Sequence, residues 1–396
     1  MTGTRIDRVE LSSFPARFRV TVRHASAVRA ATENVIVQVR TASGATGVGE
    51  GCPRRYVTGE TVQSARAFLG DVAPGAAAAA TTVDGLRSWM ADHRESIDAN
   101  PAAFCALELA LLDALGHDQG VPVEDLLGLP ELEGVARYTA VIGDSGRWVF
   151  AVLLQRYLAM GLSDFKLKLS GSLARDRRKL ARLRRRGPVV RVRVDANNLW
   201  GDARECIEHL QRLDFPFTAI EEPLAANDLA GFAAVAAALG APVVIDESAL
   251  RGDQLARLPG PAGSWALNCR VSKMGGLLRS LAAVEAARAI GMGVIVGAHV
   301  GETSILSRAA LTVAAHAGDG LVGQEGAFGT KLLHRDLVSP VVMFGRRGEL
   351  HVGAAPYRRA PGLGLTVDQS ALVGREVLVG RAGLTDGGPR PAQPPA

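Results

Sequence analysis

Short apolar runs alternate with longer segments of helical periodicity from residue 137 onward. Such alternation is typical of parallel sheets built from βα units. The pattern predicts eight strands, at 137–142, 164–169, 190–195, 217–221, 242–246, 265–269, 293–297 and 320–324. Eight units are enough to close a (β/α)8-type barrel. We therefore predict a barrel domain over residues 131–338.

The order of elements is different before the barrel. Two β-like runs lie between residue 5 and about residue 43, and VIVQV (35–39) is predicted to pair with TGVGEG (46–51) as an antiparallel hairpin. Helical periodicity follows from about 61 to 127, and Pro101 suits a first helical turn. The alanines at 76–80 are predicted to form a loop or the start of a helix. Strands followed by helices indicate an α+β domain, which we place at residues 1–130.

Strand and turn signals return after about residue 337. We assign residues 339–384 to a segment that completes the N-terminal domain. The final residues, 385–396, are polar and rich in proline, and we predict that they are disordered.

The composition excludes several classes of protein. Apolar residues make up 47% of the 396 positions, which supports a large core. The first residues, MTGTRIDRVELSSF, lack the pattern of a signal peptide, and no apolar run reaches the roughly 18 residues of a membrane span. The four cysteines are scattered, which indicates neither a disulfide framework nor a zinc cluster. We expect a soluble, cytoplasmic protein with reduced thiols and no membrane partner.

A dense group of basic residues raises the question of nucleic-acid binding. The net charge is +5, and eight arginines and lysines fall within residues 175–186. However, this run lies between two strand-like segments, FKLKL and VVRVRVD, where the alternation requires an outer helix. Aromatic residues are only 5% of the chain, which is low for a base-stacking surface. We interpret the run as a solvated helix face and predict no nucleic-acid partner.

Five charged residues lie near the C-terminal ends of predicted strands at a nearly constant spacing. They are Lys168, Asp195, Glu221, Asp246 and Lys273, separated by 27, 26, 25 and 27 residues. In a βα barrel the C-terminal strand ends meet at the catalytic mouth. Three carboxylates would therefore converge there with a lysine on either side. Oxygen ligands in this number suit Mg²⁺ or Mn²⁺ better than zinc.

The segment FKLKL carries a second lysine. Lys166 and Lys168 are two residues apart on a strand, so their side chains point to the same face. If that face is the barrel interior, each ammonium disfavours protonation of the other, which prepares a lysine to act as a base. The alternative is an outward-facing pair, but Phe165, Leu167 and Leu169 are the side chains expected to pack against the outer helices.

Several of these segments together resemble the enolase superfamily, specifically its muconate lactonizing enzyme subgroup. The resemblance rests on FKLKL, VDANN, IEEP, IDES, the lysine of NCRVSKMGGL and the glutamate of VGAHVGET. It implies a modified TIM barrel, (β/α)7β, with an α+β capping domain. It also implies an isomerase that abstracts a proton α to a carboxylate through an enolate intermediate, with bound Mg²⁺.

The resemblance also implies residue roles. Metal ligation falls to Asp195, Glu221 and Asp246. Lys168 and Lys273 become acid/base groups on opposite faces of the substrate, Lys166 supports the enolate, and Glu302 lies near the substrate carboxylate. Two further residues are candidates for orienting these groups: Glu247 beside Lys273, and Asn197, which is equally natural as a turn residue in DANNLWG.

Candidates for substrate binding lie in the loops around the mouth. Arg54, Arg55 and Tyr56, with Arg23 and His24, are placed to clamp a second anionic group, although each is also natural as a solvated loop residue. His299 either lines the pocket or is a hydrogen-bonded structural histidine. Glu325 lies in Gly323-Gln324-Glu325, where similar dipeptide epimerases carry a D-x-D pair, and this departure argues against an ordinary dipeptide substrate.

The sequence leaves more than one function open. A Mg²⁺-dependent racemase or epimerase of a small carboxylate is favoured, and a cycloisomerase or dehydratase would use the same residues. A barrel glycosidase also needs paired carboxylates, but it does not need two flanking lysines. A non-catalytic basic binding module is the third hypothesis. We expect the protein to be a homo-oligomer.

Overall fold

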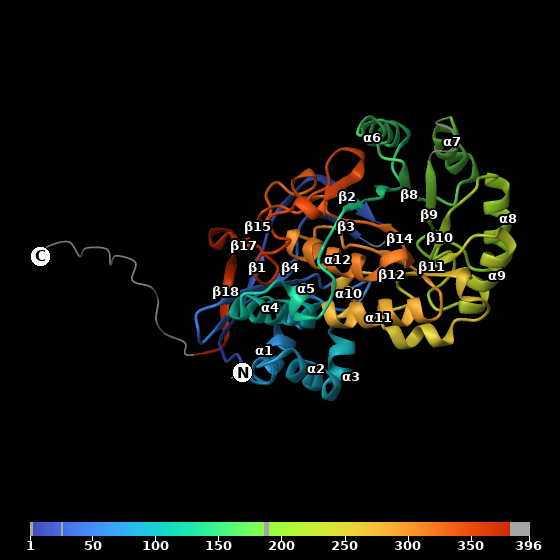
Figure 1. Ribbon diagram of the computed structural model, residues 1–396. Coiled ribbons are helices and arrows are strands. Elements are labelled where there is room, and N and C mark those ends of the chain that lie inside the picture. Colours follow the sequence, from blue (N-terminus) through green and yellow to red (C-terminus); the bar gives the residue numbers. More distant parts are fainter. Residues whose placement is uncertain (1–2, 25–26, 186–189, 381–396) are drawn as a thin grey trace, which may run out of the picture.

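The computed structural model describes residues 3–24, 27–185 and 190–380 (Figure 1). Within these ranges, eight parallel strands form one curled sheet, in the order β14-β13-β12-β11-β10-β9-β8-β7. The curl closes where the Thr139 amide donates to the Gln324 carbonyl over 2.7 Å. The strands are β7 (Ala140–Ile142), β8 (Asp164–Lys168), β9 (Arg191–Asp195), β10 (Ala219–Glu221), β11 (Val243–Ile245), β12 (Trp265–Cys269), β13 (Gly293–Val296) and β14 (Leu321–Gln324).

The predicted eight strands and their parallel arrangement are therefore confirmed. Helices cover the outside of the sheet: α6 (Arg147–Ala159), α7 (Leu173–Arg184), α8 (Ala203–Leu213), α9 (Leu229–Leu239), α11 (Leu277–Ala289) and α12 (Ser304–Ala317). The one-turn helix α10 (Val271–Met274) follows the C-terminal end of β12 and contacts α4 of the cap. Helix α7 carries the arginine-rich run, and it buries only Asp176, Lys179, Leu180 and Leu183. Its other basic side chains lie on the surface, as expected of an outer helix.

The fifth βα unit differs from the predicted strand-and-helix repeat. Between β11 and β12 the described chain forms two short 3₁₀ turns, Gly252–Arg257 and Ala262–Ser264, in place of an α-helix. The intervening sequence, LPGPAGS, explains the difference, because proline and glycine interrupt helices. The chain between β11 and β12 is nevertheless as long as in a unit with a helix, so Asp246 and Lys273 keep their spacing of 27 residues.

The capping domain combines an antiparallel sheet, in the order β18-β1-β4-β5, with a layer of helices. The hairpin of β4 and β5 is confirmed. The N-terminal elements are β1 (Ile6–Phe14), β2 (Arg17–His24), β3 (Ala27–Ala31), β4 (Asn34–Thr41), β5 (Thr46–Gly51), α1 (Val62–Ala79), α2 (Val83–Asp92), α3 (Arg94–Ala99), α4 (Pro101–Gln119) and α5 (Val123–Leu126). The connecting and C-terminal strands are β6 (Val135–Arg137), β15 (Val338–Ser339), β16 (Glu349–His351), β17 (Thr366–Val367) and β18 (Val373–Val379).

Residues 76–80 were expected to form a loop or a helix start, and this prediction is wrong. They end α1, which begins after the N-cap Thr61. Alanine has the highest helix propensity, so a run of alanines extends a helix already started. The predicted disordered tail, 385–396, lies outside the described residues.

Within the cap, strand β5 packs against helix α4 with very close backbone contact. A Cβ added at Gly49 of β5 would lie 2.0 Å from the carbonyl oxygen of Ala106 on α4. Only glycine permits this approach. The contact holds β5 against α4, and the Cys52 amide, directly after β5, donates to Ser272 Oγ on the barrel side over 2.8 Å.

The barrel interior is packed separately from the rest of the core. Ala219, Val244, Ala266 and Ile295 form a small apolar cluster of their own inside the sheet. Phe165 and Leu167 belong instead to the large core between the sheet, helices and cap. The alternation in β8 therefore places Lys166 and Lys168 inside, as predicted. No helix in the described ranges is both long and apolar enough to cross a membrane.

Candidate active site

The predicted charged residues come together at the C-terminal ends of the barrel strands. Lys168 pairs in register with Asp195, and Asp195 with Glu221, so these three lie at one level on β8, β9 and β10. Asp246 directly follows β11. Lys273 is fully buried and lies on the one-turn helix α10, four residues beyond the end of β12. The helix, rather than the strand, thus delivers the fifth residue.

Lys166 is held by carboxylates. Its Nζ lies 2.7 Å from Glu221 Oε1 and 3.4 Å from both Asp195 Oδ2 and Glu325 Oε1. Burial lowers the pKa of this ammonium, but the attraction of Glu221, Glu325 and Asp195 outweighs burial and raises the pKa overall. Lys166 is therefore a fixed positive charge, which differs from the expectation that each lysine would make the other easier to deprotonate.

Lys168 behaves as expected of a base. Its side chain is 15% exposed, and Nζ donates to Asn197 Oδ1 over 2.5 Å. Burial lowers its pKa, the charge of Lys166 adds to this, and Asp195 at 3.5 Å opposes it. Asn197 adopts a left-handed conformation, with φ of 49°, and its backbone amide donates to Asp195 Oδ1. It is both a turn residue and a partner of the site.

Lys273 has three acceptors: Asp246 Oδ1 at 2.9 Å, and the carbonyl oxygens of Asp246 and Asn268, both at 2.7 Å. Burial lowers its pKa to about 7, and the nearby Arg270 guanidinium acts in the same direction. Burial also raises the pKa of the Glu247 carboxyl to about 7, with the neighbouring Glu222 and Glu221 acting in the same sense.

The three strand-end carboxylates provide oxygen donors suited to a hard divalent cation. Asp246 contacts Arg270 and Lys273, and Glu221 contacts Lys166. Within the described part of the chain, the buried Glu221 Oε2 has no hydrogen-bond partner. The Arg193 Nε lies 3.8 Å from this oxygen, beyond hydrogen-bond distance, so the oxygen remains available as a ligand and the residues present fit a metal.

Arg193 is a site residue that was not predicted from the sequence. It is buried on β9, its guanidinium contacts Glu325, and its Nε lies 3.8 Å from Glu221 Oε2. Gly323 makes room for it, because an added Cβ there would lie 2.7 Å from Arg193 Nη1. Strand alternation could have identified this residue, since Arg193 precedes Asp195 by two positions and shares its face.

His299 and Glu302 follow β13; His299 is buried, and the Glu302 side chain is 7% exposed. The His299 amide donates to Glu302 Oε1 over 2.6 Å, and burial raises the pKa of the Glu302 carboxyl to about 8. Burial lowers the pKa of His299 well below its usual value. Neither ring nitrogen has a hydrogen-bond partner among the described residues. The geometry therefore does not favour the hydrogen-bonded structural histidine considered above.

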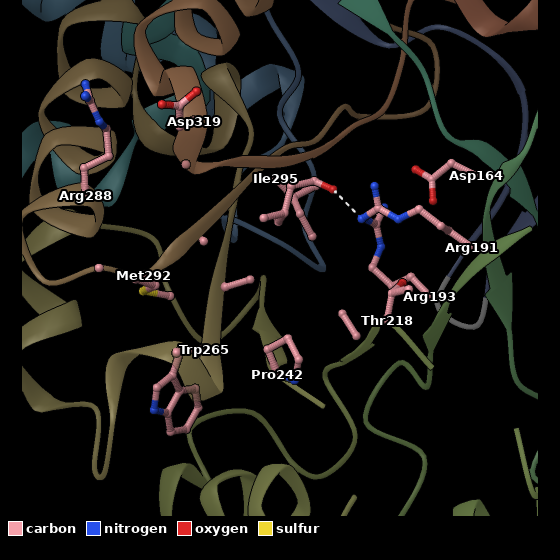
Figure 2. A pocket seen from close by; sticks show the side chains of 17 residues that line it. Asp164, Arg191, Arg193, Thr218, Pro242, Trp265, Arg288, Met292, Ile295 and Asp319 are labelled. Carbon is pink, nitrogen blue, oxygen red and sulfur yellow. Dashed lines mark hydrogen bonds between the residues drawn. The ribbon is translucent and has the colours of Figure 1, made fainter. Parts of the chain in front are cut away.

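A cavity of about 540 Å³ lies at the other end of the barrel. Figure 2 shows residues that line it, and several of them begin or precede barrel strands: Asp164, Arg191, Thr218, Pro242 and Trp265. The cavity therefore opens at the N-terminal strand ends, away from Lys168 and Asp246. It is not the site formed by the carboxylates and lysines.

Comparison with known families agrees with this architecture. Residues 149–371 match the family described as Enolase C-terminal domain-like, and residues 8–128 match the Mandelate racemase / muconate lactonizing enzyme, N-terminal domain. The chain belongs to the mandelate racemase/muconate lactonizing enzyme group of the enolase superfamily. It is an isomerase of that superfamily, as the resemblance implied.

Three relatives illustrate the range of this group. Aromatic dipeptide epimerase from Herpetosiphon aurantiacus is 29% identical over 74% of this chain and 82% of the relative. Muconate cycloisomerase 1 from Pseudomonas putida is 28% identical over 85% of this chain and 89% of the relative. The crystal structure of N-succinyl Arg/Lys racemase from Bacillus cereus superposes with a TM-score of 0.82 at 21% identity, covering 94% of this chain and 99% of that one. This last likeness concerns the fold.

The cap residues that were predicted to bind substrate differ in their exposure to solvent. Arg54 is 1% exposed and donates to the carbonyls of Pro53 and Val300 and to Asn34 Oδ1, over 2.9, 3.2 and 2.8 Å. Arg55 is exposed and Tyr56 is half-buried. The side chains of Arg23 and His24 lie outside the described part of the structure. Arg29 on β3 was not predicted, and its guanidinium lies over the Tyr56 ring at 5.9 Å.

Proposed function

We propose that the protein is a Mg²⁺-dependent racemase or epimerase that moves the proton α to a carboxylate. One observation carries the proposal. Lys168 on β8 and Lys273 after β12 lie four strands apart in the ring, and the three strands between them end in Asp195, Glu221 and Asp246. Two amines on opposite sides of a carboxylate cluster suit proton removal from one face and proton return to the other.

The roles of the chain's own residues follow from their positions. Asp195, Glu221 and Asp246 would hold Mg²⁺, which supplies positive charge to the substrate carboxylate when bound. The Lys166 ammonium, fixed by Glu221 at 2.7 Å, adds charge where the enolate develops. The Lys168 amine takes the α-proton from one enantiomer, and the Lys273 ammonium returns a proton to the opposite face. For the other enantiomer the two lysines exchange roles.

We infer further that the substrate is an N-acylated α-amino acid rather than a free dipeptide. Glu325, the acidic residue at the end of β14, contacts Arg193 and Lys166 and is therefore already neutralised. A substrate ammonium would have to compete with both cations. The racemase from Bacillus cereus acts, by its name, on N-succinyl Arg/Lys, whose α-nitrogen carries no charge.

A cycloisomerase remains the second candidate because the same lysines and carboxylates serve it, and muconate cycloisomerase 1 is a relative of comparable similarity. In that case only one lysine transfers a proton. Proton exchange NMR in D₂O with Mg²⁺ distinguishes the two. We expect α-deuterium incorporation into N-acylated amino acids; conversion of a muconate without such exchange would replace the racemase proposal.

Single lysine variants test the two-base arrangement directly. Lys273→Ala should abolish net racemisation while one antipode still exchanges its α-proton with D₂O. Lys168→Ala should show the opposite preference, and each loss should be about 10²- to 10⁴-fold for the affected antipode. If both variants act on the same stereoisomer, a one-base mechanism is correct.

We also propose a cytoplasmic homo-oligomer. All four cysteines are free and buried, which suits a reducing compartment. Helix α6 exposes Trp148, Val149 and Val152, which are 76%, 54% and 67% exposed, as an apolar face for a second copy. Light scattering that gives the monomer mass of 41.5 kDa at micromolar concentration would contradict the oligomer.

A further inference from the structure

A second group of potential ligands lies where the cap meets the barrel. It consists of Cys52, directly after β5, with His299 and Glu302, from the loop after β13. Their ligand atoms all lie within 4.8 Å of one another, and His299 Nδ1 is 3.5 Å from Glu302 Oε1. None of the three serves in the carboxylate cluster of Asp195, Glu221 and Asp246.

We propose that Cys52, His299 and Glu302 bind a thiophilic divalent cation, Zn²⁺ in the first instance. Ligand atoms around a tetrahedral zinc ion are about 3.3 to 3.8 Å apart, given metal–ligand distances of 2.0 to 2.3 Å. The observed separations need only small side-chain movements to reach this range. One sulfur, one imidazole nitrogen and one carboxylate oxygen leave a fourth position open to water or another ligand.

The histidine provides an independent reason for a ligand. The His299 side chain is 1% exposed, and both ring nitrogens are buried without a hydrogen-bond partner in the described structure. Burying such a nitrogen normally costs free energy. A cation bound to one of these nitrogens would compensate this cost.

The backbone that carries these ligands is firmly held. Asn34 Nδ2 donates to the Gly301 carbonyl over 2.8 Å, and Arg54 Nη2 donates to the Val300 carbonyl over 3.2 Å. On the other side, the Cys52 amide donates to Ser272 Oγ over 2.8 Å. Both segments are therefore fixed in position before a cation arrives, which favours binding.

Charge balance also permits the site. Binding releases the Cys52 thiol proton and the Glu302 carboxyl proton, and His299 enters as the neutral imidazole. Two protons leave and one divalent cation enters, so the net charge of the buried pocket does not change. The nearby Arg54 and Arg270 guanidinium groups therefore face a neutral complex.

The two cation sites would select different metals. Three carboxylates favour Mg²⁺, whereas a thiolate favours Zn²⁺ or Cd²⁺. If the proposed function is correct, Glu302 lies near the substrate carboxylate, and a cation on it would hinder substrate binding. This consequence rests on the proposed function, but the binding site itself does not.

Cadmium titration in excess Mg²⁺ tests the site without any substrate. We expect one equivalent of Cd²⁺ to produce the ultraviolet charge-transfer band of a cadmium–thiolate bond. Cys52→Ser should remove the band, whereas Cys206→Ser and Cys105→Ser, which alter other buried cysteines, should retain it. No band in the wild type, or an undiminished band in Cys52→Ser, would overturn the proposal.

A second variant tests the site independently, in case Cys52→Ser fails to fold. His299→Gln retains the thiol, so the band should form, but Cd²⁺ affinity should fall by more than the about 10- to 100-fold that loss of an outer-shell partner costs. Wild-type affinity in His299→Gln would also refute the three-residue site. A racemase assay that fails, with the band intact, would remove the proposed function and leave the metal site standing.

Discussion

Buried carboxylates occur in two regions of this molecule, and they are compensated in different ways. At the barrel mouth the partners are charged side chains, as in the 2.7 Å contact of Glu221 with Lys166. At the contact between cap and barrel they are backbone amides. Glu108 of α4 accepts from the amides of Leu277 and Leu278 over 2.9 and 2.7 Å, at the beginning of α11.

The pKa values of the two regions differ accordingly. Burial would raise the pKa of Glu221, but Lys166 and Arg193 lower it to about 2. Burial raises the pKa of Glu108 to about 7, and the amides of Leu278 and Leu277 oppose this only in part. Asp113, inside the cap, behaves in the same way: burial raises its pKa to about 7, and the amides of Leu363 and Val48 oppose this only in part. Lys166 and Arg193 therefore keep Glu221 ionised for a cation, whereas Glu108 joins helix α4 of the cap to helix α11 of the barrel.

The largest effect is expected from a carboxylate at the mouth. Asp195→Asn removes one ligand oxygen and the charge beside Lys166 and Lys168, so kcat/KM should fall by about 10³-fold. Mg²⁺ affinity, measured by calorimetry, should fall with it, and the melting temperature should stay close to that of the wild type. Full activity of Asp195→Asn in excess EDTA would contradict a metal site.

The matched change at the cap contact should affect stability instead. Glu108→Ala leaves the buried amides of Leu277 and Leu278 without an acceptor, which should cost about 2 to 3 kcal/mol of unfolding free energy. Urea unfolding measures this loss, and Glu108→Gln, which keeps one acceptor, should lose less. Mg²⁺ affinity should be unchanged below the unfolding transition. A tenfold loss of Mg²⁺ affinity would show that the two regions are not independent.

The difference between the regions also decides what the sequence could predict. Lys166, Lys168 and Asp195 follow from strand alternation and spacing, which are local patterns. Lys273 also lies at the barrel mouth, as predicted, although it is on helix α10 and not at a strand end. Glu108 contacts Leu277, 169 residues away in the chain, and nothing in the apolar helix around Glu108 indicates that partner.

Other features depended on the same kind of long-range contact. The pairing of Arg193 with Glu325 joins β9 to the end of β14, and Cys52 meets His299 only because the cap docks on the barrel. The replacement of the fifth helix by 3₁₀ turns was different, because its prolines and glycines were visible in the sequence. The regular spacing concealed that signal.

The third prediction concerns how the free energy of unfolding changes with pH. The Glu108 carboxyl is the group expected to cause the change. This carboxyl titrates near 4.3 in an unfolded chain, and burial raises its folded pKa to about 7. The folded protein therefore retains a proton that the unfolded chain has lost between these values. The stability contributed by this group is complete below about pH 4.3 and is lost as the pH rises through about 7.

Urea unfolding between pH 5 and pH 8 measures this loss, at most about 1.4 kcal/mol per pH unit. Asp113, with its pKa also raised to about 7 by burial, should contribute in the same direction. Glu108→Gln cannot titrate, so its stability should decline less over this range. Identical slopes for Glu108→Gln and the wild type would show that Glu108 is ionised in the folded state.

The smallest expected effect separates two neighbouring arginines in the cap. Arg54 is buried and bonded to protein carbonyls, whereas Arg55 is exposed. If Arg55 clamps a distal anion of the substrate, Arg55→Ala should raise KM about 2- to 5-fold and leave kcat unchanged, because a solvated ion pair contributes little and contributes equally to ground and transition states. Arg54→Met should instead lower the melting temperature and kcat together, since its donors hold the loop that carries His299 and Glu302. A KM increase confined to Arg54→Met, with normal stability, would assign the clamp to Arg54 and leave Arg55 as a solvated residue.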